Sequence, residues 1–384
     1  MEKRIYPLHN QKIGSWRYAS GVLAVREEKL LARRTIEDLF QVQTEEDLLH
    51  QISSQYRGET MEEALREARE ADAALLRKLA PEALYPLFAV ELNEGHNLRR
   101  SLKAYLMKNL TAEEGDRQFL GPYFHTPTEL QKKIEKKTQE LSGSMTPGPA
   151  AAPLGGELGP DWVDKAIAKA LQDYRDTQEV SSLGTAVDQA YFARYRSLLK
   201  ESKNPWLQAY GALAIDQVNL GILLRTKKLG LAPEVFREAY LVGGGISQST
   251  YEGALTALAS QPSQEESKLV EKADQHEADH HKVVSPLKLT SPYLNEEESY
   301  QLAQLISFAG SDAARQYSAY FDQIRGRYLE EASLRPGTAE KAFSYFAYRA
   351  MERKNLQLIL AAVRNHLDRE EVKKLLRPCY KEQR

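Results

Sequence analysis

Glu352-Arg353-Lys354-Asn355-Leu356 lies at the centre of the stretch Phe346–Tyr380, and two earlier stretches repeat its pattern. They are Asp216-Gln217-Val218-Asn219-Leu220 and Glu94-Gly95-His96-Asn97-Leu98. Each reads as an acid, two variable residues, Asn and Leu. An aromatic residue precedes each Asn by nine positions and a Leu follows it by five: Phe88 and Leu102, Tyr210 and Leu224, Phe346 and Leu360. Because self-similarity at long, comparable spacing marks repeated structural units, the sequence predicts three related units.

The periodicity of the chain is helical from Trp16 onward, with apolar residues every three to five positions. Helix-capping signatures recur, each a Thr followed within three residues by acids that support the first turn. They begin at Thr44, Thr60, Thr111 and Thr126. Alternating apolar runs of strand type are nearly absent. These patterns predict an all-α fold.

The repeats divide the chain into three expected helical units, 1–120, 121–245 and 246–384. Two segments have no counterpart in the other units. Residues 142–160 are rich in Gly, Pro and Ala, a composition typical of a flexible connection. Residues 261–293 begin with a run of Glu, Lys, Asp and His, which favours a solvated helix or a mobile excursion. We interpret both as insertions, the first into unit two and the second into unit three.

The repeated polar residues are Glu94 and Asn97, Asp216 and Asn219, and Glu352 and Asn355. Acid and Asn are three apart in each pair, so they share one strip of a helix. In the first repeat the apolar stripe runs through Phe88, Leu92 and Leu98, and Asn97 is expected to point away from it. One interpretation is structural, since a buried carboxylate and amide need hydrogen-bond partners. The other is that the three strips face a shared axis and contact a partner. No nucleophile and base accompany any pair, so we expect no catalytic role.

Composition restricts the class of protein. The 384 residues carry 52 Lys and Arg against 54 Asp and Glu, and this balance provides no global field to attract nucleic acid or an anionic membrane. Cys379 is the single cysteine, so no internal disulfide is expected. We find no signal-peptide pattern at the N-terminus and no apolar run of spanning length. The expected location is a reducing compartment, with no membrane insertion by the chain itself.

His276-Glu277-Ala278-Asp279-His280 satisfies the H-E-x-x-H pattern of zinc hydrolases. A third ligand would be sought among Glu296, Glu297 and Glu298. The flanking residues are strongly polar, however, whereas a catalytic zinc needs a dry cavity and an ordered second shell. A solvated helix is the favoured interpretation, with adventitious metal binding by His276, His280 and His281 left open.

Nucleotide and nucleic-acid binding find little support. Gly243-Gly244-Gly245-Ile246-Ser247 lacks the Lys of a phosphate-binding loop. A basic and aromatic cluster at residues 191–196 has the spacing of an amphipathic helix face, although such residues also stack on bases. The five isolated histidines form no recognisable constellation; they are His9, His50, His96, His125 and His366. We therefore expect no cofactor, no metal and no nucleic acid.

Motifs spread along the chain resemble the C-subunit family of the V/A-type rotary ATPases, which includes the d subunit of the eukaryotic V-ATPase. The matching elements are His96-Asn97-Leu98-Arg99, Asp188-Gln189-Ala190-Tyr191-Phe192, Ile215-Asp216 through Asn219-Leu220, and Glu352-Arg353-Lys354-Asn355-Leu356 with Ile359. Residues 18–31 are similar to the family's opening helix. The resemblance leaves out residues 142–160 and 261–293. It also departs from the family's Pro-Gly-Gly after unit two, where Val242 replaces the Pro.

The resemblance implies a non-catalytic rotor subunit of the central stalk. Three similar helical domains would surround a pseudo-threefold axis and form a funnel. One copy per complex would sit on the cytoplasmic side of the proteolipid ring and receive the central-shaft subunits D and F, coupling ATP chemistry to proton or sodium transport. Two alternatives stay open from the residues alone: a helical-repeat scaffold unrelated to ATPases, and a zinc hydrolase using the H-E-x-x-H pattern.

Overall fold

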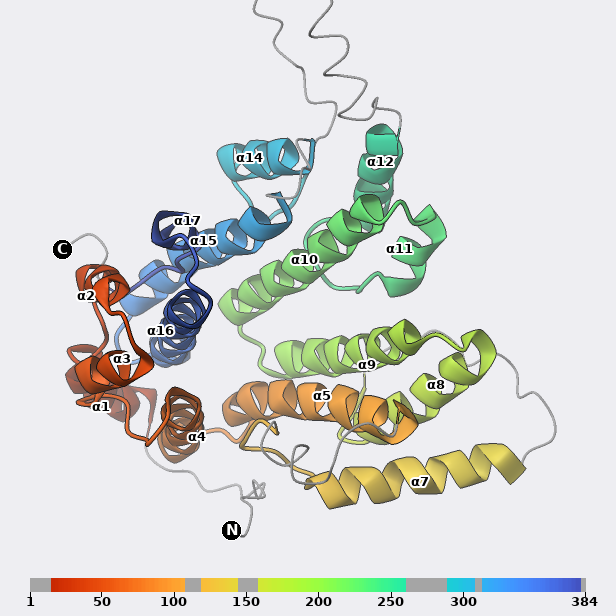
Figure 1. The fold of residues 1–384 in the computed structure, drawn as a ribbon, viewed down its shortest axis with the longest axis horizontal. Coiled ribbons are helices and arrows are strands. Elements are labelled where there is room, and N and C mark those ends of the chain that lie inside the picture. The colour runs from red at the N-terminus through yellow and green to blue at the C-terminus, as the bar shows by residue number, and fades with distance from the viewer. Residues whose placement is uncertain (1–14, 108–118, 144–157, 260–288, 308–312, 381–384) are drawn as a thin grey trace, which may run out of the picture. The chain divides into compact units, whose positions relative to one another are not determined.

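The computed structural model describes residues 15–107, 119–143, 158–259, 289–307 and 313–380 (Figure 1). These residues are organised as α-helices, and within the described ranges no extended strand occurs, which confirms the all-α prediction. The predicted insertions lie largely outside the described residues, at 144–157 and 260–288, as do Thr111 and the H-E-x-x-H segment. Two compact bodies are present: the described residues up to Tyr210 with those from Arg325 on, and Gly211–Ile324.

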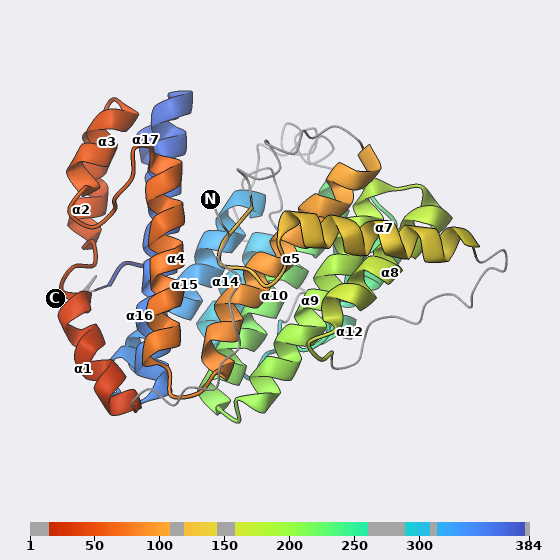
Figure 2. The same cartoon turned by 90° about the horizontal axis from the view of Figure 1, so that it is seen from below.

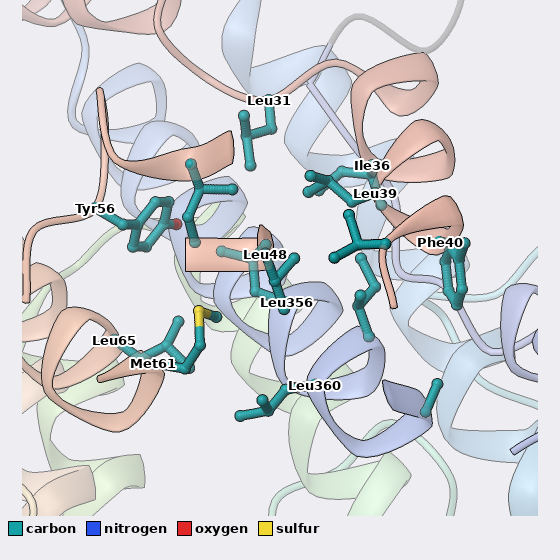
Figure 3. Close-up of a cluster of buried hydrophobic side chains, with 14 of the residues drawn as sticks. Leu31, Ile36, Leu39, Phe40, Leu48, Tyr56, Met61, Leu65, Leu356 and Leu360 are labelled. Atoms are coloured by element: carbon teal, nitrogen blue, oxygen red, sulfur yellow. The ribbon is translucent and has the colours of Figure 1, made fainter. Parts of the chain in front are cut away.

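The first part of the first body joins the beginning and the end of the chain. Its helices are α1 (Trp16–Glu27), α2 (Arg33–Asp38), η1 (Leu39–Gln41), α3 (Glu45–Ile52), α4 (Met61–Leu79), α16 (Ala339–Asn365) and α17 (Arg369–Lys373). Helices α4 and α16 run side by side (Figure 2). In Figure 3, Ile36, Leu39 and Leu48 converge with Leu356 on one apolar core. Burial of one large apolar side chain contributes about 1.5–3 kcal/mol to stability. Because this core contains side chains from residues 31–68 and from residues 356–379, it holds the beginning and the end of the chain together.

The second part of the first body is a layer of antiparallel and crossing helices. It contains α5 (Leu84–Met107), α7 (Pro127–Gly143), α8 (Trp162–Thr177) and α9 (Val180–Glu201). Helix α9 packs against both α5 and α8, and α7 packs against α5 and α8. Phe88 on α5 contacts Tyr195 on α9 edge to face, and it also contacts Phe343 on α16. An aromatic contact therefore connects the two parts of this body.

The second body is built from the remaining helices. They are α10 (Pro205–Lys228, which starts in the first body), α11 (Pro233–Ala239), α12 (Gln248–Ala259), α14 (Glu296–Ser307) and α15 (Ala313–Ser333, which ends in the first). Leu213, Ile215 and Leu223 are fully buried on α10. The Gln217 side chain donates to the Ser318 carbonyl at 3.0 Å, which places α10 beside α15. A helix buried on several sides needs apolar residues all round, as α10 has.

Predicted helix signals correspond to observed ends. The hydroxyls of Thr44, Thr60 and Thr126 accept the backbone N–H of the residue three positions on, at 3.1, 3.2 and 3.2 Å. Gly230 (φ 60°) terminates α10, and Pro233 begins α11. Both findings confirm the predicted helix ends. The Thr hydroxyls stabilise the helix starts because they accept backbone N–H groups that have no partner inside the helix.

Among the residues that the structure describes, no helix combines the length and the apolar character needed to cross a membrane.

Candidate functional site

The three repeated asparagines make the same contact. Each side-chain oxygen accepts the backbone N–H of a later residue, and each side-chain amide donates to the carbonyl of that same residue. The pairs are Asn97 with Leu120 (2.9 and 3.0 Å), Asn219 with Leu241 (2.8 and 2.8 Å) and Asn355 with Arg377 (2.8 and 3.1 Å). The partner lies 23, 22 and 22 residues downstream, respectively. All three asparagines are fully buried, so these hydrogen bonds satisfy amides that water cannot reach.

The contact closes a helical hairpin. In the second and third repeats, a long helix (α10 or α16) ends in a left-handed residue and is followed by a short helix (α11 or α17). The chain after the short helix then returns to the Asn in the middle of the long one. In the first repeat the residues after α5 lie outside the described ranges until 119, yet Leu120 occupies the corresponding position against Asn97. The asparagines therefore fix where the chain returns to the helix.

The acids of the first two repeats bind the chain just beyond that point. Glu94 accepts the backbone N–H of Phe124 at 3.0 Å and contacts Nδ1 of His125 at 2.6 Å. Asp216 accepts the backbone N–H groups of Gly245 and Ile246 at 2.8 and 3.1 Å. These partners lie 29 to 31 residues downstream of the acid. Acid and Asn together hold two successive points of one returning segment.

The third acid has different partners. Glu352 accepts the backbone N–H of Leu31 and the hydroxyl of Tyr56, both at 2.6 Å. It also forms a buried ion pair with Arg349, which bonds the Tyr56 hydroxyl at 3.0 Å. The residues that would correspond to the downstream partners, 381 and 382, lie outside the described ranges. In the described structure Glu352 thus fastens the beginning of the chain to α16.

Electrostatics distinguish the acids further. Burial raises the pKa of Asp216 to about 7, although two backbone N–H groups and the Tyr251 hydroxyl lower it. Burial also raises the pKa of Glu352, against the opposing effects of the Arg349 charge and the Tyr56 hydrogen bond. Glu352 is therefore held by a cation, whereas Asp216 faces neutral donors.

A close approach explains the glycine run after unit two. A Cβ placed on Gly244 would lie 2.1 Å from Oδ1 of Asp216, so a side chain at this position requires Asp216 to move. Gly243 has a φ of 110°, which side-chain-bearing residues rarely adopt. The run therefore allows the backbone to pass over the Asp216 carboxylate.

Sequence reasoning missed two features of this region. His125 is not isolated, because it contacts Glu94, and its position 31 residues after that acid was the only available signal. The apolar stripe of the first repeat was also incomplete as a guide to burial: Leu92 belongs to that stripe but is 56 % exposed, whereas Asn97, expected to point away from it, is fully buried. The reason is that the chain segment around Leu120 covers the Asn side of α5, and a helical wheel cannot register a covering loop.

The repeated acids and asparagines hold backbone groups in every repeat, with side-chain partners added at Glu94 and Glu352. Across the described residues, no group of three His, Cys, Asp or Glu side chains is placed to hold a metal ion. Glu298 accepts the Asn295 N–H at the start of α14, a capping contact. His276, His280 and His281 lie outside the described residues.

Comparison with known sequences gives one family. No curated protein sequence matches the chain. The family model described as ATP synthase (C/AC39) subunit matches residues 19–375, which include all three acid–asparagine pairs. We conclude that the chain belongs to the ATP synthase (C/AC39) subunit family, whose members are central-stalk subunits of V/A-type ATPases.

Proposed function

We propose that this protein is a non-catalytic rotor subunit that couples the central shaft of a V/A-type ATPase to its membrane proteolipid ring. The observation that carries the proposal is the family match over residues 19–375. Shaft subunits D and F would enter the protein as into a socket, and one copy would serve each complex. The subunit would lie on the cytoplasmic face of the membrane and transmit torque between ATP chemistry and proton or sodium movement.

The buried polar pairs support a mechanical role. A part that transmits torque must resist shear between its helices. Asn219 and Asn355 each hold a returning segment to the middle of a long helix by two hydrogen bonds, and burial keeps water from competing for them. Each hydrogen bond contributes roughly 0.5–1.5 kcal/mol to stability. Breaking one inside the protein leaves a donor and an acceptor that water cannot reach, so no hydrogen bond to solvent replaces it. This construction suits a stiff coupling element.

We further propose that the repeats correspond to three similar domains around a pseudo-threefold axis, forming a funnel. The predicted boundaries remain 1–120, 121–245 and 246–384. The shared Asn contact in all three repeats supports common ancestry of the units. Helix packing adds a detail, since α5 of the first unit packs against α7 and α9 of the second. Under this proposal, a helix of the first unit would form part of the same packed layer as two helices of the second unit.

The test is deletion of the subunit from the assembled ATPase. We expect ATP hydrolysis by the isolated catalytic head to persist, because the head contains its own nucleotide sites. ATP-driven ion transport in reconstituted vesicles should disappear and return when the purified chain is added back. Loss of the head's own hydrolysis would contradict the proposal.

Co-purification supplies an independent check. From detergent-solubilised membranes, the tagged chain should bring down both the shaft subunits and the proteolipid. Recovery of neither would favour a helical scaffold with other partners.

A further inference from the structure

The turn between α10 and α11 exposes a run of apolar residues (Figure 1). Every residue from 228 to 235 is exposed. A Cβ placed on Gly230, in the middle of the turn, would meet no atom within 4 Å. Single exposed aliphatic residues are ordinary on a protein surface, but three within seven consecutive positions form a patch. They are Leu229, Leu231 and Val235, with 61, 42 and 40 % of their surfaces exposed.

The corresponding turn of the third repeat has the same backbone conformation but a polar surface. When the two repeats are aligned on their asparagines, Leu229 corresponds to Asn365 and Val235 to Glu371. Both polar side chains are exposed. Two exposed positions that are polar in one hairpin are therefore apolar in the other. Because an apolar side chain gains nothing from facing water, the exchange indicates that the turn after α10 is covered when the protein acts.

Cations adjoin this apolar patch and lack partners. Arg225, Lys227 and Lys228 lie in the last turn of α10. Within the described ranges, none of the three forms a salt bridge or a side-chain hydrogen bond. Burial lowers the pKa of Lys227, with no carboxylate to oppose that effect. The turn therefore presents positive charge beside its apolar residues. We call residues 225–235 the α10–α11 tip.

The third hairpin again differs, because its cations are engaged within the chain. The ion pairs are Arg364 with Glu45 and Glu62, Lys373 with Glu370, and Lys374 with Glu371. Two hairpins with the same path thus expose opposite surfaces. One is polar with paired charges, and the other is apolar with unpaired cations.

We propose that the α10–α11 tip docks on an anionic lipid surface. Aliphatic side chains enter the boundary between headgroups and acyl chains, while flexible Lys and Arg side chains reach the anionic headgroups. A protein partner would need a groove shaped to this exposed turn, whereas lipid headgroups rearrange around it. The balanced charge of the whole chain does not oppose the contact, because salt screens charges farther away than about 10 Å. The inference does not depend on the proposed function.

The test uses the full-length chain and vesicles of phosphatidylcholine, with or without an equal amount of phosphatidylserine. At low salt the chain should co-sediment with the vesicles that contain phosphatidylserine, and the bound fraction should fall as sodium chloride is added. Neutral vesicles should bind the chain at least tenfold more weakly, since each cation near an anionic surface strengthens binding about fivefold.

Two double variants separate the apolar and the charged contributions. Leu229→Asn with Val235→Gln makes the tip polar without adding charge, and Lys227→Gln with Lys228→Gln removes two unpaired cations. Each double variant should weaken binding to the anionic vesicles at least tenfold. Neither should lower the thermal midpoint, because none of these four side chains is buried.

Leu367→Asn and Lys374→Gln are the matched controls, since they change the same residue types in the third hairpin. Both should bind anionic vesicles as the native chain does. The inference would be overturned if the native chain bound neither kind of vesicle or bound both equally. Unchanged binding in both double variants, or an equal loss in the controls, would also overturn it.

Other occupants of the tip would give different results. If the native chain self-associated with rising concentration and Leu229→Asn with Val235→Gln abolished that association in sedimentation velocity, the tip would be an interface between copies. If the native chain ignored vesicles and the same variant lost a protein in co-purification, the tip would face a protein. Either result would show that the proposed lipid contact is wrong.

Discussion

The second and third repeats share one contact and differ in the other. Asn219 and Asn355 each bind the backbone of a residue 22 positions downstream, with nearly equal distances. The acids three residues before them diverge, because Asp216 binds two backbone amides of its own returning chain while Glu352 binds Leu31, Tyr56 and Arg349. The Asn contact is the same in both repeats because the returning chain passes the same point of the long helix. The partners of the acid differ because the donors that surround it differ between the two repeats.

The largest effect should follow loss of the acid that holds a cation. Glu352→Ala leaves Arg349 and Tyr56 buried without this partner, and removing one member of a buried pair costs about 3–5 kcal/mol. Urea unfolding followed by circular dichroism measures the loss. Glu330→Ala, at an exposed position on α15, is the control and should change stability by less than about 0.5 kcal/mol. If both variants unfolded at the native urea concentration, Glu352 would not connect the chain ends.

The asparagines should respond alike. Asn219→Ala and Asn355→Ala each remove two hydrogen bonds to the returning backbone, one to an N–H and one to a carbonyl, and we expect a loss of about 2–4 kcal/mol at both sites. Asn219→Asp should destabilise at least as much, because its second carboxylate oxygen would face the Leu241 carbonyl. The measurement is the urea midpoint of each variant. A large loss at one site and none at the other would break the equivalence of the two hairpins.

Asp216 should show a smaller effect that depends on pH. Asp216→Ala should cost about 1–3 kcal/mol, since it unpairs the amides of Gly245 and Ile246. Burial raises the pKa of Asp216 from 3.8 to about 7 in the folded protein. The folded chain therefore binds this proton more tightly than the unfolded chain, and the corresponding stability is complete below pH 4 and lost as the pH rises through 7.

Measuring the free energy of unfolding as a function of pH tests this prediction for Asp216→Ala. The stability difference between the native chain and Asp216→Ala should shrink between pH 5 and pH 8. A difference that grew over this interval would show that the three donors, rather than burial, set the pKa of Asp216.

Particular residues show what the sequence could predict. The threonine caps and the stop at Gly230 depend on a few neighbouring residues, so local pattern was sufficient to place those helix ends. The Asn repeat could be found because its side chains are part of the pattern. Its partners could not, because Leu120, Leu241 and Arg377 contribute backbone groups, which any residue possesses.

Long-range contacts were beyond reach for a related reason. Tyr56 and Leu31 meet Glu352 across about three hundred residues of chain, and no periodicity links them. Leu92 fits the apolar stripe of α5 but is exposed, since what covers a helix face is decided by the rest of the fold. The aligned parts of the three repeats were therefore predictable, and the contacts that make them different were not.

The smallest and most discriminating prediction concerns the ends of the two long helices. Gly230 and His366 occupy the same place, eleven residues after the repeated Asn, with φ angles of 60° and 50°. In each case the next residue donates its N–H to the carbonyl five positions back, Leu231 to Thr226 at 3.0 Å and Leu367 to Ala362 at 3.1 Å. The two turns therefore have one geometry, yet only Gly adopts it without steric cost.

Opposite substitutions should consequently have opposite signs. Gly230→Ala should lower stability by about 1 kcal/mol, because a Cβ disfavours the left-handed conformation. His366→Gly should raise it by roughly 0.5 kcal/mol, since relief of that strain exceeds the added freedom of the unfolded chain. Thermal midpoints of the two variants measure both effects, and Gly21→Ala in α1, where a Cβ meets no atom within 4 Å, is the control for a glycine whose replacement favours the helix. If both substitutions lowered stability, the His366 side chain would itself stabilise its turn. The two helix ends would then share a backbone conformation but depend on different interactions.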